Sequence, residues 1–371
     1  MRANNVLGLI YSNAYDSALP EFTSLRTMGS VPFGGRYRLI DFVLSNMVNC
    51  GMSKVGIVTK NNYQSLLDHI GSGKPWDLSR KNEGLFILPP FASRTSGVYE
   101  NRIEALKGNM RFMARSNEEY VILSDCNVIC NMDFTKLFDA HTRSGADITI
   151  VYKNGPVPKL DDLMTFGFGA DGRVNEIMVN RAINGDANYS LNMFIMRKSL
   201  LQRLINEAMS LHFDSFERDI FQRNVLNLNI RGYEEKGFVR VINGLKSYFD
   251  ANLDLLVPEN RRELFKVDKP VYTKVHDEVP AKYGLGSEVR NSLVADGCII
   301  DGTVENCILF RGVRIGKGAV VKNSIIMQGT MISENVSLDC TVIDKSAVIK
   351  PGKTLIGDKS YPIYIGKEII I

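Results

Sequence analysis

The stretch "VRIGKGAVVKNSIIMQGTMI", residues 313–332, decides the fold of the C-terminal part of this chain. Aliphatic residues recur every six positions within it and beyond it. They are Leu309, Ile315, Val321 and Met327 in one register, Val320, Ile326, Ile332 and Leu338 in a second, and Val336, Val342 and Val348 after a slip of phase. A period of six fits neither a helix nor a hairpin, but it is typical of a parallel β-helix whose hexapeptides each form one side of a coil. We predict a left-handed parallel β-helix domain over residues 286–371.

Residues 1–256 show a different pattern, in which apolar runs alternate with helical periodicity. The runs "NVLGLIY" (5–11) and "YVILS" (120–124) are typical of buried strands, and "RIEALKGNMRFMARS" (102–116) of a helix. This alternation predicts an α/β domain with a Rossmann-like, mostly parallel sheet covered by helices on both faces. Residues 257–285 carry prolines and charges without periodicity, so we interpret them as a connector.

The composition limits the partners of the chain. Of 371 residues, 44% are hydrophobic, and the formal net charge of +4 comes from interspersed charges rather than from runs. No stretch approaches the ~18 apolar residues of a membrane span, and the start lacks the pattern of a signal peptide. We therefore expect neither a nucleic-acid partner nor a membrane, but small molecules or other proteins.

The cysteines bear on the cellular compartment and on metal binding. They are scattered without a CxxC pair, which favours reduced thiols and a cytoplasmic location. Cys126 and Cys130 are possible metal ligands, but no histidine or second cysteine pair accompanies them, so buried free thiols are favoured. The six are Cys50, Cys126, Cys130, Cys298, Cys307 and Cys340.

A polar cluster follows one of the predicted strands. In "ILSDCNVICNMDF" (122–134), Asp125, Cys126 and Asn127 come after an aliphatic run, which places them at the ligand-binding edge of a parallel sheet. The β-helix offers a competing site, because many hexapeptide proteins are acyltransferases with a histidine base. None of the four histidines lies in the β-helix, so a role in structure and assembly is favoured for that domain.

Several motifs together resemble one enzyme family. The segments, which extend over nearly the whole chain, are "VPFGGRYRLIDFVLSN" (31–46), "GSGKPWDL" (71–78), "FILPP" (86–90), "NMDF" (131–134), "FGFGADGRVNEI" (166–177) and "FDANLDLL" (249–256). With the β-helix, they resemble bacterial glucose-1-phosphate adenylyltransferase, also called ADP-glucose pyrophosphorylase, and within that family its D-type regulatory subunit. In the family, glucose 1-phosphate attacks the α-phosphate of ATP and displaces pyrophosphate. That chemistry needs a phosphate cradle and carboxylates that hold magnesium.

The phosphate cradle implied by the resemblance is degenerate. The family's LAGGxGxRL loop matches "YSNAYDSAL" (11–19), where its glycine positions include Asp16 and its catalytic arginine is Ala18. The lysine of the family's KPAVPFGG is Met28. Because an aspartate repels a polyphosphate and two cations are missing, we expect this loop not to hold a nucleotide.

The metal site implied by the resemblance is degenerate as well. Aligned on "NMDF", the family's magnesium-binding aspartate falls on Asn127, a neutral amide and a poor sole ligand. Asp125 remains as a residual candidate after a local shift. The segment with the second metal carboxylate is absent, since "NGLKSYFDANLDLL" (243–256) runs straight into a helix. We expect this chain to bind no metal or other cofactor, and Mg²⁺ to be bound by a catalytic partner.

The sugar-phosphate and nucleotide motifs have also changed. The lysine of the family's EKP falls on Asn180, and the first glycine of its GTADA falls on Asn101. Two neighbouring arginines, Arg102 and Arg181, would restore positive charge if they point into the site, but surface arginines are favoured.

Three arginines match an allosteric anion site of regulated family members, namely Arg26, Arg36 and Arg38. Arg36 and Arg38 share one face of an extended segment, so they are able to grip a phosphate or carboxylate of an effector. The alternative is that they pair with nearby carboxylates such as Asp41. The sequence leaves both readings open.

Taken together, the degenerate motifs favour a catalytically deficient regulatory subunit that activates a catalytic subunit in a tetrameric assembly for glycogen biosynthesis. One alternative is an active or weakly active adenylyltransferase rebuilt around Asp125, Arg102 and Arg181. A second is a sensor that binds sugar phosphates or nucleotides without turnover.

Overall fold

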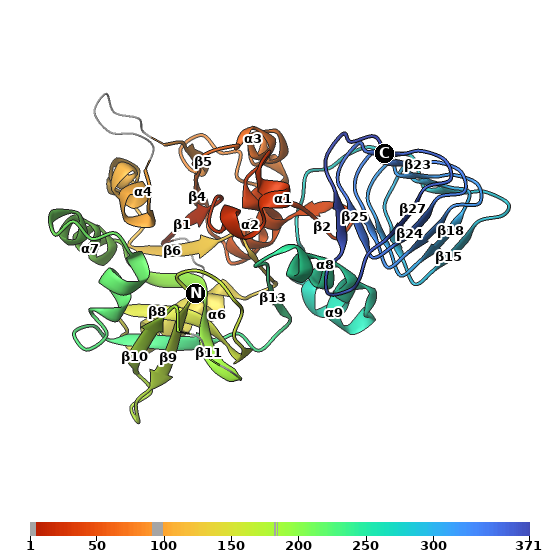
Figure 1. Cartoon of the computed structure of the whole chain (residues 1–371). Coiled ribbons are helices and arrows are strands. Elements are labelled where there is room, and N and C mark those ends of the chain that lie inside the picture. Colours follow the sequence, from red (N-terminus) through yellow and green to blue (C-terminus); the bar gives the residue numbers. More distant parts are fainter. Residues whose placement is uncertain (1–4, 91–98, 182, 184) are drawn as a thin grey trace.

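The structure, a computed structural model, describes residues 5–90, 99–181, 183 and 185–371. A mixed α/β domain and a β-helix lie side by side, and helices α8 and α9 lie next to the β-helix (Figure 1). The predicted fold class is confirmed. None of the helices within these ranges is long and apolar enough to cross a membrane.

Within the described ranges, nine strands form the central sheet of the first domain, in the order β10-β9-β11-β6-β1-β4-β5, with β8 paired to β11 and β12 paired to β8. It is parallel from β6 through β1 and β4 to β5 and antiparallel around the long strand β11. The strands are β1 (Val6–Tyr11), β4 (Lys54–Val58), β5 (Gly84–Leu88), β6 (Tyr120–Asp125), β8 (Ile148–Pro156), β9 (Met164–Phe168), β10 (Val174–Val179), β11 (Asp186–Arg197) and β12 (Ile230–Glu234). Two small pairs are β2 (Pro32–Phe33) with β3 (Tyr37–Arg38), and β7 (Val128–Cys130) with β13 (Val239–Val241).

Strand β1 shows that the sheet is buried on both faces, because its side chains pack into two apolar clusters. Val6 and Ile10 belong to one apolar cluster, whereas Leu7 and Leu9 belong to the other, because successive side chains of a strand point to opposite faces. The helices that supply residues to these clusters and to the interface of the two domains are α1 (Pro20–Thr23), α2 (Leu39–Asn49), α3 (Gln64–Ile70), α4 (Arg102–Gly108), α5 (Met110–Ala114), α6 (Phe134–Ser144), α7 (Lys198–Ser210), α8 (Leu245–Leu253) and α9 (Pro258–Leu264).

The second domain is a left-handed parallel β-helix of three five-stranded sheets. Its strands are β14 (Lys282–Tyr283), β15 (Glu288–Arg290), β16 (Leu293–Val294), β17 (Ile299–Ile300), β18 (Thr303–Glu305), β19 (Ile308–Leu309), β20 (Arg314–Ile315), β21 (Val320–Lys322), β22 (Ile325–Ile326), β23 (Met331–Ile332), β24 (Ser337–Asp339), β25 (Thr341–Ile343), β26 (Val348–Ile349), β27 (Thr354–Ile356) and β28 (Ile363–Ile365). The hexapeptide prediction is confirmed, because Ile315, Ile332 and Ile349 stack on one another in successive coils and are buried.

One corner of the β-helix explains the recurring asparagines. Asn291, Asn306 and Asn323 all have a positive φ, a backbone conformation that asparagine tolerates better than most residues. Their side chains also form a ladder, in which the amide of Asn291 donates to Asn306 at 2.7 Å and that of Asn306 donates to Asn323 at 3.2 Å. The ladder fixes the corner from coil to coil.

The predicted connector is more ordered than expected. Helix α9 and strand β14 both lie inside residues 257–285, so the first coil of the β-helix begins before residue 286. Leu264 of α9 joins a third apolar cluster, which also contains Phe22 of the α/β domain and Ile308 of the β-helix. Apolar packing against the β-helix therefore orders a helix that shows no periodicity in the sequence.

The interpretation of Cys126 and Cys130 as buried free thiols is confirmed, and the other four cysteines are buried and free as well. Burial raises the pKa of both thiols that were considered as metal ligands. The pKa of Cys130 lies above its usual value, and the pKa of Cys126 lies well above it. A protonated thiol is a poor metal ligand. The alternative of a Cys126 and Cys130 metal site has no support in this geometry.

Candidate functional site

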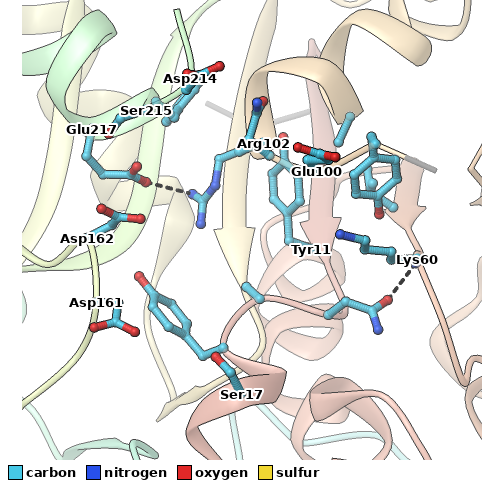
Figure 2. Close-up of a pocket in the computed structure, with 18 residues that line it drawn as sticks. Tyr11, Ser17, Lys60, Glu100, Arg102, Asp161, Asp162, Asp214, Ser215 and Glu217 are labelled. Atoms are coloured by element: carbon cyan, nitrogen blue, oxygen red, sulfur yellow. Dashed lines mark hydrogen bonds and ion pairs between the residues drawn. The ribbon is translucent and has the colours of Figure 1, made fainter. Parts of the chain in front are cut away.

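A cavity of about 390 Å³ lies where strands β1 and β4 end, beside Asp125 at the end of β6, which pairs with Tyr11 (Figure 2). Its walls come from the loop after β1, the N-terminus of α4 and a π-helical segment, Phe216–Gln222. Helix α4 begins at Arg102 because the side chain of Asn101 accepts a hydrogen bond from the Glu104 N–H, which caps the helix. The predicted ligand edge of the sheet therefore borders a cavity.

Arg102 forms the centre of a buried ion network in this cavity. Its Nη2 donates to both oxygens of Asp125, at 3.0 and 2.8 Å, and its Nη1 lies 3.8 Å from Glu217. The guanidinium also lies 4.7 Å from the ring centroid of Tyr11. The favoured prediction that Arg102 is a surface residue is wrong, because its side chain is only 12% exposed. Asp125 needs a cation because it is completely buried, and Arg102 supplies it.

Burial and the network shift the acidity of both carboxyl groups. Burial raises the pKa of Asp125, and the neighbouring Arg102 opposes this effect. Burial likewise raises the pKa of Glu217 to about 7, again opposed by Arg102. The guanidinium therefore keeps two strongly desolvated carboxyl groups in the ionised form more readily than burial alone would allow.

The residues present do not fit a magnesium ion. Asp125 is engaged with Arg102, and the amide of the buried Asn127 donates to the carbonyl of Ile242 at 3.3 Å. Only Ile242, Asn243 and Gly244 connect β13 to α8, so the segment with the second metal carboxylate has no room here. Within the part of the chain that the structure describes, no group of three or more His, Cys, Asp or Glu residues is placed to hold a metal ion.

The loop that matches the family's phosphate cradle is closed by its own carboxylate. Asp16 accepts a hydrogen bond from the Met28 N–H at 2.7 Å and from the Asn13 amide at 2.6 Å. Burial raises the pKa of Asp16 to about 6, and these two hydrogen bonds oppose the rise. In a phosphate cradle, such N–H groups would donate hydrogen bonds to the bound anion. Here they donate to Asp16 instead, so the loop forms a rigid turn and is not suited to binding a polyphosphate.

The predicted sugar-phosphate positions line a second cavity, of about 580 Å³, which shares Tyr15, Ser17 and Asp161 with the first. Ala18 and Asn180 are both in its wall. Arg181 lies there too and is exposed, as predicted for a surface arginine. Asn180 replaces the family's lysine, and no buried cation among the described residues of this cavity takes over the positive charge of that lysine.

The structure separates the three predicted effector arginines. Arg26 is 3% exposed and donates from both terminal nitrogens to Asp344 of the β-helix, at 3.0 and 2.8 Å. Its guanidinium is therefore occupied by a carboxylate of the chain itself, and an ion pair between the two domains replaces the predicted role in effector binding. Asp41 was considered as the carboxylate that pairs with the side chains of Arg36 and Arg38. It contacts His69 at 2.6 Å and accepts a hydrogen bond from the Arg38 backbone N–H.

Arg36 and Arg38 lie around a small cavity, of about 40 Å³, between the α/β domain and the β-helix. The β-helix contributes Arg311 and Lys345, two residues that lie outside the motifs recognised in the sequence. Arg311 is 7% exposed, and its Nε has no hydrogen-bond partner. Burial, followed by the charges of Arg38 and Arg26, lowers the pKa of Lys345 to about 7. In the sequence, Arg311 stands out only as a charged residue between the aliphatic positions of a coil. That position does not reveal which residues surround its side chain.

Comparison with known proteins first gives the class of protein. Residues 19–177 match the family described as nucleotidyl transferase, and residues 277–361 match the family described as GlmU-like, C-terminal hexapeptide. The chain thus has a nucleotidyltransferase domain followed by a hexapeptide β-helix.

Similar proteins narrow the class further. The chain is 34% identical to glycogen biosynthesis protein GlgD of Bacillus subtilis (strain 168) over 367 residues, which cover 99% of this chain and 97% of the relative. It is 38% identical to GlgD of Geobacillus stearothermophilus over 86% of this chain and 83% of the relative. It is 30% identical to glucose-1-phosphate adenylyltransferase of Clostridium perfringens (strain SM101 / Type A) over 100% of this chain and 97% of the relative. The chain belongs to the glucose-1-phosphate adenylyltransferase family, which includes the GlgD proteins.

Proposed function

We propose that this chain is a catalytically deficient regulatory subunit, which supports ADP-glucose formation for glycogen biosynthesis by activating a catalytic glucose-1-phosphate adenylyltransferase subunit. The main support is the Arg102–Asp125 ion pair, because a guanidinium occupies the one carboxylate left near the family's metal position. Contacts with a catalytic partner shift that partner toward its active state only if they are stronger in the active state than in the inactive state. We place the assembly, a tetramer, in the cytoplasm and its Mg²⁺ on the catalytic subunit.

The test is an assay of pyrophosphate release from ATP and glucose 1-phosphate. We expect the purified chain alone to give no turnover above background, and its addition to the catalytic subunit of the same organism to raise that subunit's activity several-fold. Turnover by the chain alone at the rate of an active homologue would favour the rebuilt enzyme instead. Binding of sugar phosphates with no effect on the catalytic subunit would favour the sensor.

Replacing Asn127 with aspartate is expected to destabilise the chain without creating activity. The new carboxylate would be buried against the Ile242 carbonyl, which the present amide contacts at 3.3 Å, and an unpaired buried charge of this kind costs about 2–4 kcal/mol or more. Urea unfolding and the pyrophosphate assay measure the two effects. The exposed Asn227→Asp serves as control and should be neutral. Substantial recovery of activity in Asn127→Asp would show that the remaining site is intact.

A second part of the proposal concerns regulation. We propose that the cavity between the domains binds a small anionic effector, because the buried Nε of Arg311 has no partner. The cationic side chains of Arg36, Arg38 and Lys345 line the same cavity. The charges of Arg38, Arg26, Asp344 and Lys367 act on Lys345. The nearby carboxylates are Asp41, which contacts His69, and Asp296 and Glu278, which act on Arg311. Burial lowers the pKa of His69 and of His276, so the arginines and Lys345 supply the charge at neutral pH.

Arg311→Met is expected to weaken the binding of inorganic phosphate or glucose 1-phosphate about tenfold, the value of one charge-assisted hydrogen bond. Binding should also weaken as the pH rises through about 7, because the pKa of Lys345 lies there and only its protonated form attracts an anion. Isothermal titration at pH 6 and pH 8.5 measures both effects. Arg314→Met, an exposed arginine of the next strand, is the control. Equal affinities for wild type and Arg311→Met would place the anion elsewhere.

A further inference from the structure

Hydrogen-bonding groups remain unused in the cavity at the ends of β1 and β4. The Tyr11 hydroxyl is buried without a hydrogen-bond partner, and so is Nη1 of Arg102. Glu217 is 4% exposed, and the nitrogen of Arg102 nearest to its carboxylate lies 3.8 Å away, outside hydrogen-bonding distance. Buried polar groups without partners are costly, so the Tyr11 hydroxyl and Nη1 of Arg102 indicate a ligand with complementary groups, and the carboxylate of Glu217 lies beside them as an acceptor.

The rim of the cavity disfavours anions. Four carboxylates lie around it, those of Glu100, Asp161, Asp162 and Asp214, together with a single lysine, Lys60, whose ammonium lies over the Tyr99 ring at 5.5 Å (Figure 2). Asp16, in the loop after β1, adds a further negative charge in its ionised form and acts on Tyr99 of the cavity wall. A polyphosphate or sugar phosphate would meet like charges on entering.

The inner wall disfavours cations, because the guanidinium of Arg102 forms part of it. It also provides both hydrogen-bonding roles, since Arg102 donates, Glu217 accepts and the Tyr11 hydroxyl does either. Hydroxyl groups of a neutral ligand match this set, because each one donates and accepts. The charge of the rim and the chemistry of the wall therefore agree on a neutral, polyhydroxylated ligand.

The size and the remaining walls fit a sugar ring. The cavity measures about 390 Å³ and adjoins the cavity of about 580 Å³, with Tyr15, Ser17 and Asp161 common to both. A pyranose has C–H groups on its faces, which pack on aromatic rings such as Tyr15 and Tyr99, and hydroxyls at its edge. We propose that this cavity binds a neutral carbohydrate of one or two sugar rings, whose hydroxyls bond to Tyr11, Arg102 and Glu217. The proposal holds whether or not the chain activates a partner.

The test compares D-glucose and maltose with ATP and spermidine by isothermal titration and saturation-transfer NMR on the full chain. We expect saturable binding of at least one sugar at one site per chain, and none of ATP or spermidine at this cavity. Tyr11→Phe should weaken sugar binding about fivefold while leaving the chain as stable as before, because the lost hydroxyl has no partner in the protein. Glu217→Gln should weaken it about tenfold, since a bond to a charged group is lost. Tyr361→Phe, an exposed tyrosine of the β-helix, is the control.

Three outcomes would overturn the proposal. One is the absence of saturable binding by both sugars. Another is binding of ATP or spermidine in competition with the sugar. The third is an unchanged sugar affinity in folded Tyr11→Phe and Glu217→Gln, which would place the sugar outside this cavity. Each of them leaves the activation assay of the proposed function unaffected.

Discussion

Arg102→Met is expected to lower the free energy of unfolding by about 3–5 kcal/mol, the cost of leaving a buried charge without its partner. Asp125 is completely buried and takes two hydrogen bonds from Arg102, while Glu217 is 4% exposed and has Arg102 as its nearest cation. Methionine fills much of the same volume without charge, so the loss reflects electrostatics rather than a cavity. Urea unfolding followed by the fluorescence of Trp76, the one tryptophan of the chain, measures it.

The pH dependence of this loss identifies its cause. The pKa of Glu217 is about 7 in the folded chain and that of Asp125 is raised, so both groups bind protons more readily when folded than when unfolded. Stability therefore falls as the pH rises through the interval up to about 7, and removal of Arg102 enlarges the fall because both pKa values rise further. We expect Arg102→Met to cost clearly more at pH 8 than at pH 5.

A double-mutant cycle provides the control. In the Asp125→Asn background, Arg102→Met should cost less, because the more deeply buried of the two carboxylates that need Arg102 is gone and only Glu217 remains. An equal cost in both backgrounds, or a cost that does not change between pH 5 and pH 8, would mean that Arg102 stabilises the chain mainly through its contacts with Tyr11 and Phe216.

The sequence predicts the β-helix well because its signal is local and repeated. Ile315, Ile332 and Val342 are buried and lie at positions that the six-residue period predicts to be buried, although the last register is less exact, since Ile349 is buried where Val348 was predicted. The order inside residues 257–285 was not predictable in this way. Leu264 is buried by residues from both domains, so the information that orders α9 lies in tertiary packing and not in its own periodicity.

Predictions for the site differ in quality for a similar reason. Loss of a carboxylate at Asn127 is a property of one position and can be read from an alignment of motifs. The ion pair of Arg102 with Asp125 joins residues of a helix and a strand that are far apart in the chain, and neither residue alone announces the other. The same holds for Arg311, which belongs to the β-helix. Its position in a coil does not show that it lines one cavity with Arg36 and Arg38 of the α/β domain.

Arg26→Met is expected to cost about 3–5 kcal/mol as well, but its main effect should be to separate the two domains in unfolding. Asp344 has no exposed surface and receives both terminal nitrogens of Arg26, with the Tyr364 hydroxyl at 2.9 Å as a further donor. Phe22 packs on Tyr364 in the same region, with ring centroids 4.9 Å apart. The ion pair thus lies inside an apolar interface, where an unpaired carboxylate is especially unfavourable.

Two spectroscopic probes distinguish unfolding of the α/β domain alone from unfolding of both domains. Trp76 is buried in the α/β domain, whereas far-UV circular dichroism includes the strands of the β-helix. We expect one common urea transition by both probes in the wild type and two distinct transitions in Arg26→Met, because the domains unfold together only while their interface is intact. Asp344→Asn combined with Arg26→Met should recover part of the loss, since no buried charge then remains unpaired. If both probes still coincide in Arg26→Met at a shifted midpoint, the apolar contacts around Phe22 couple the domains by themselves and the ion pair only adds stability.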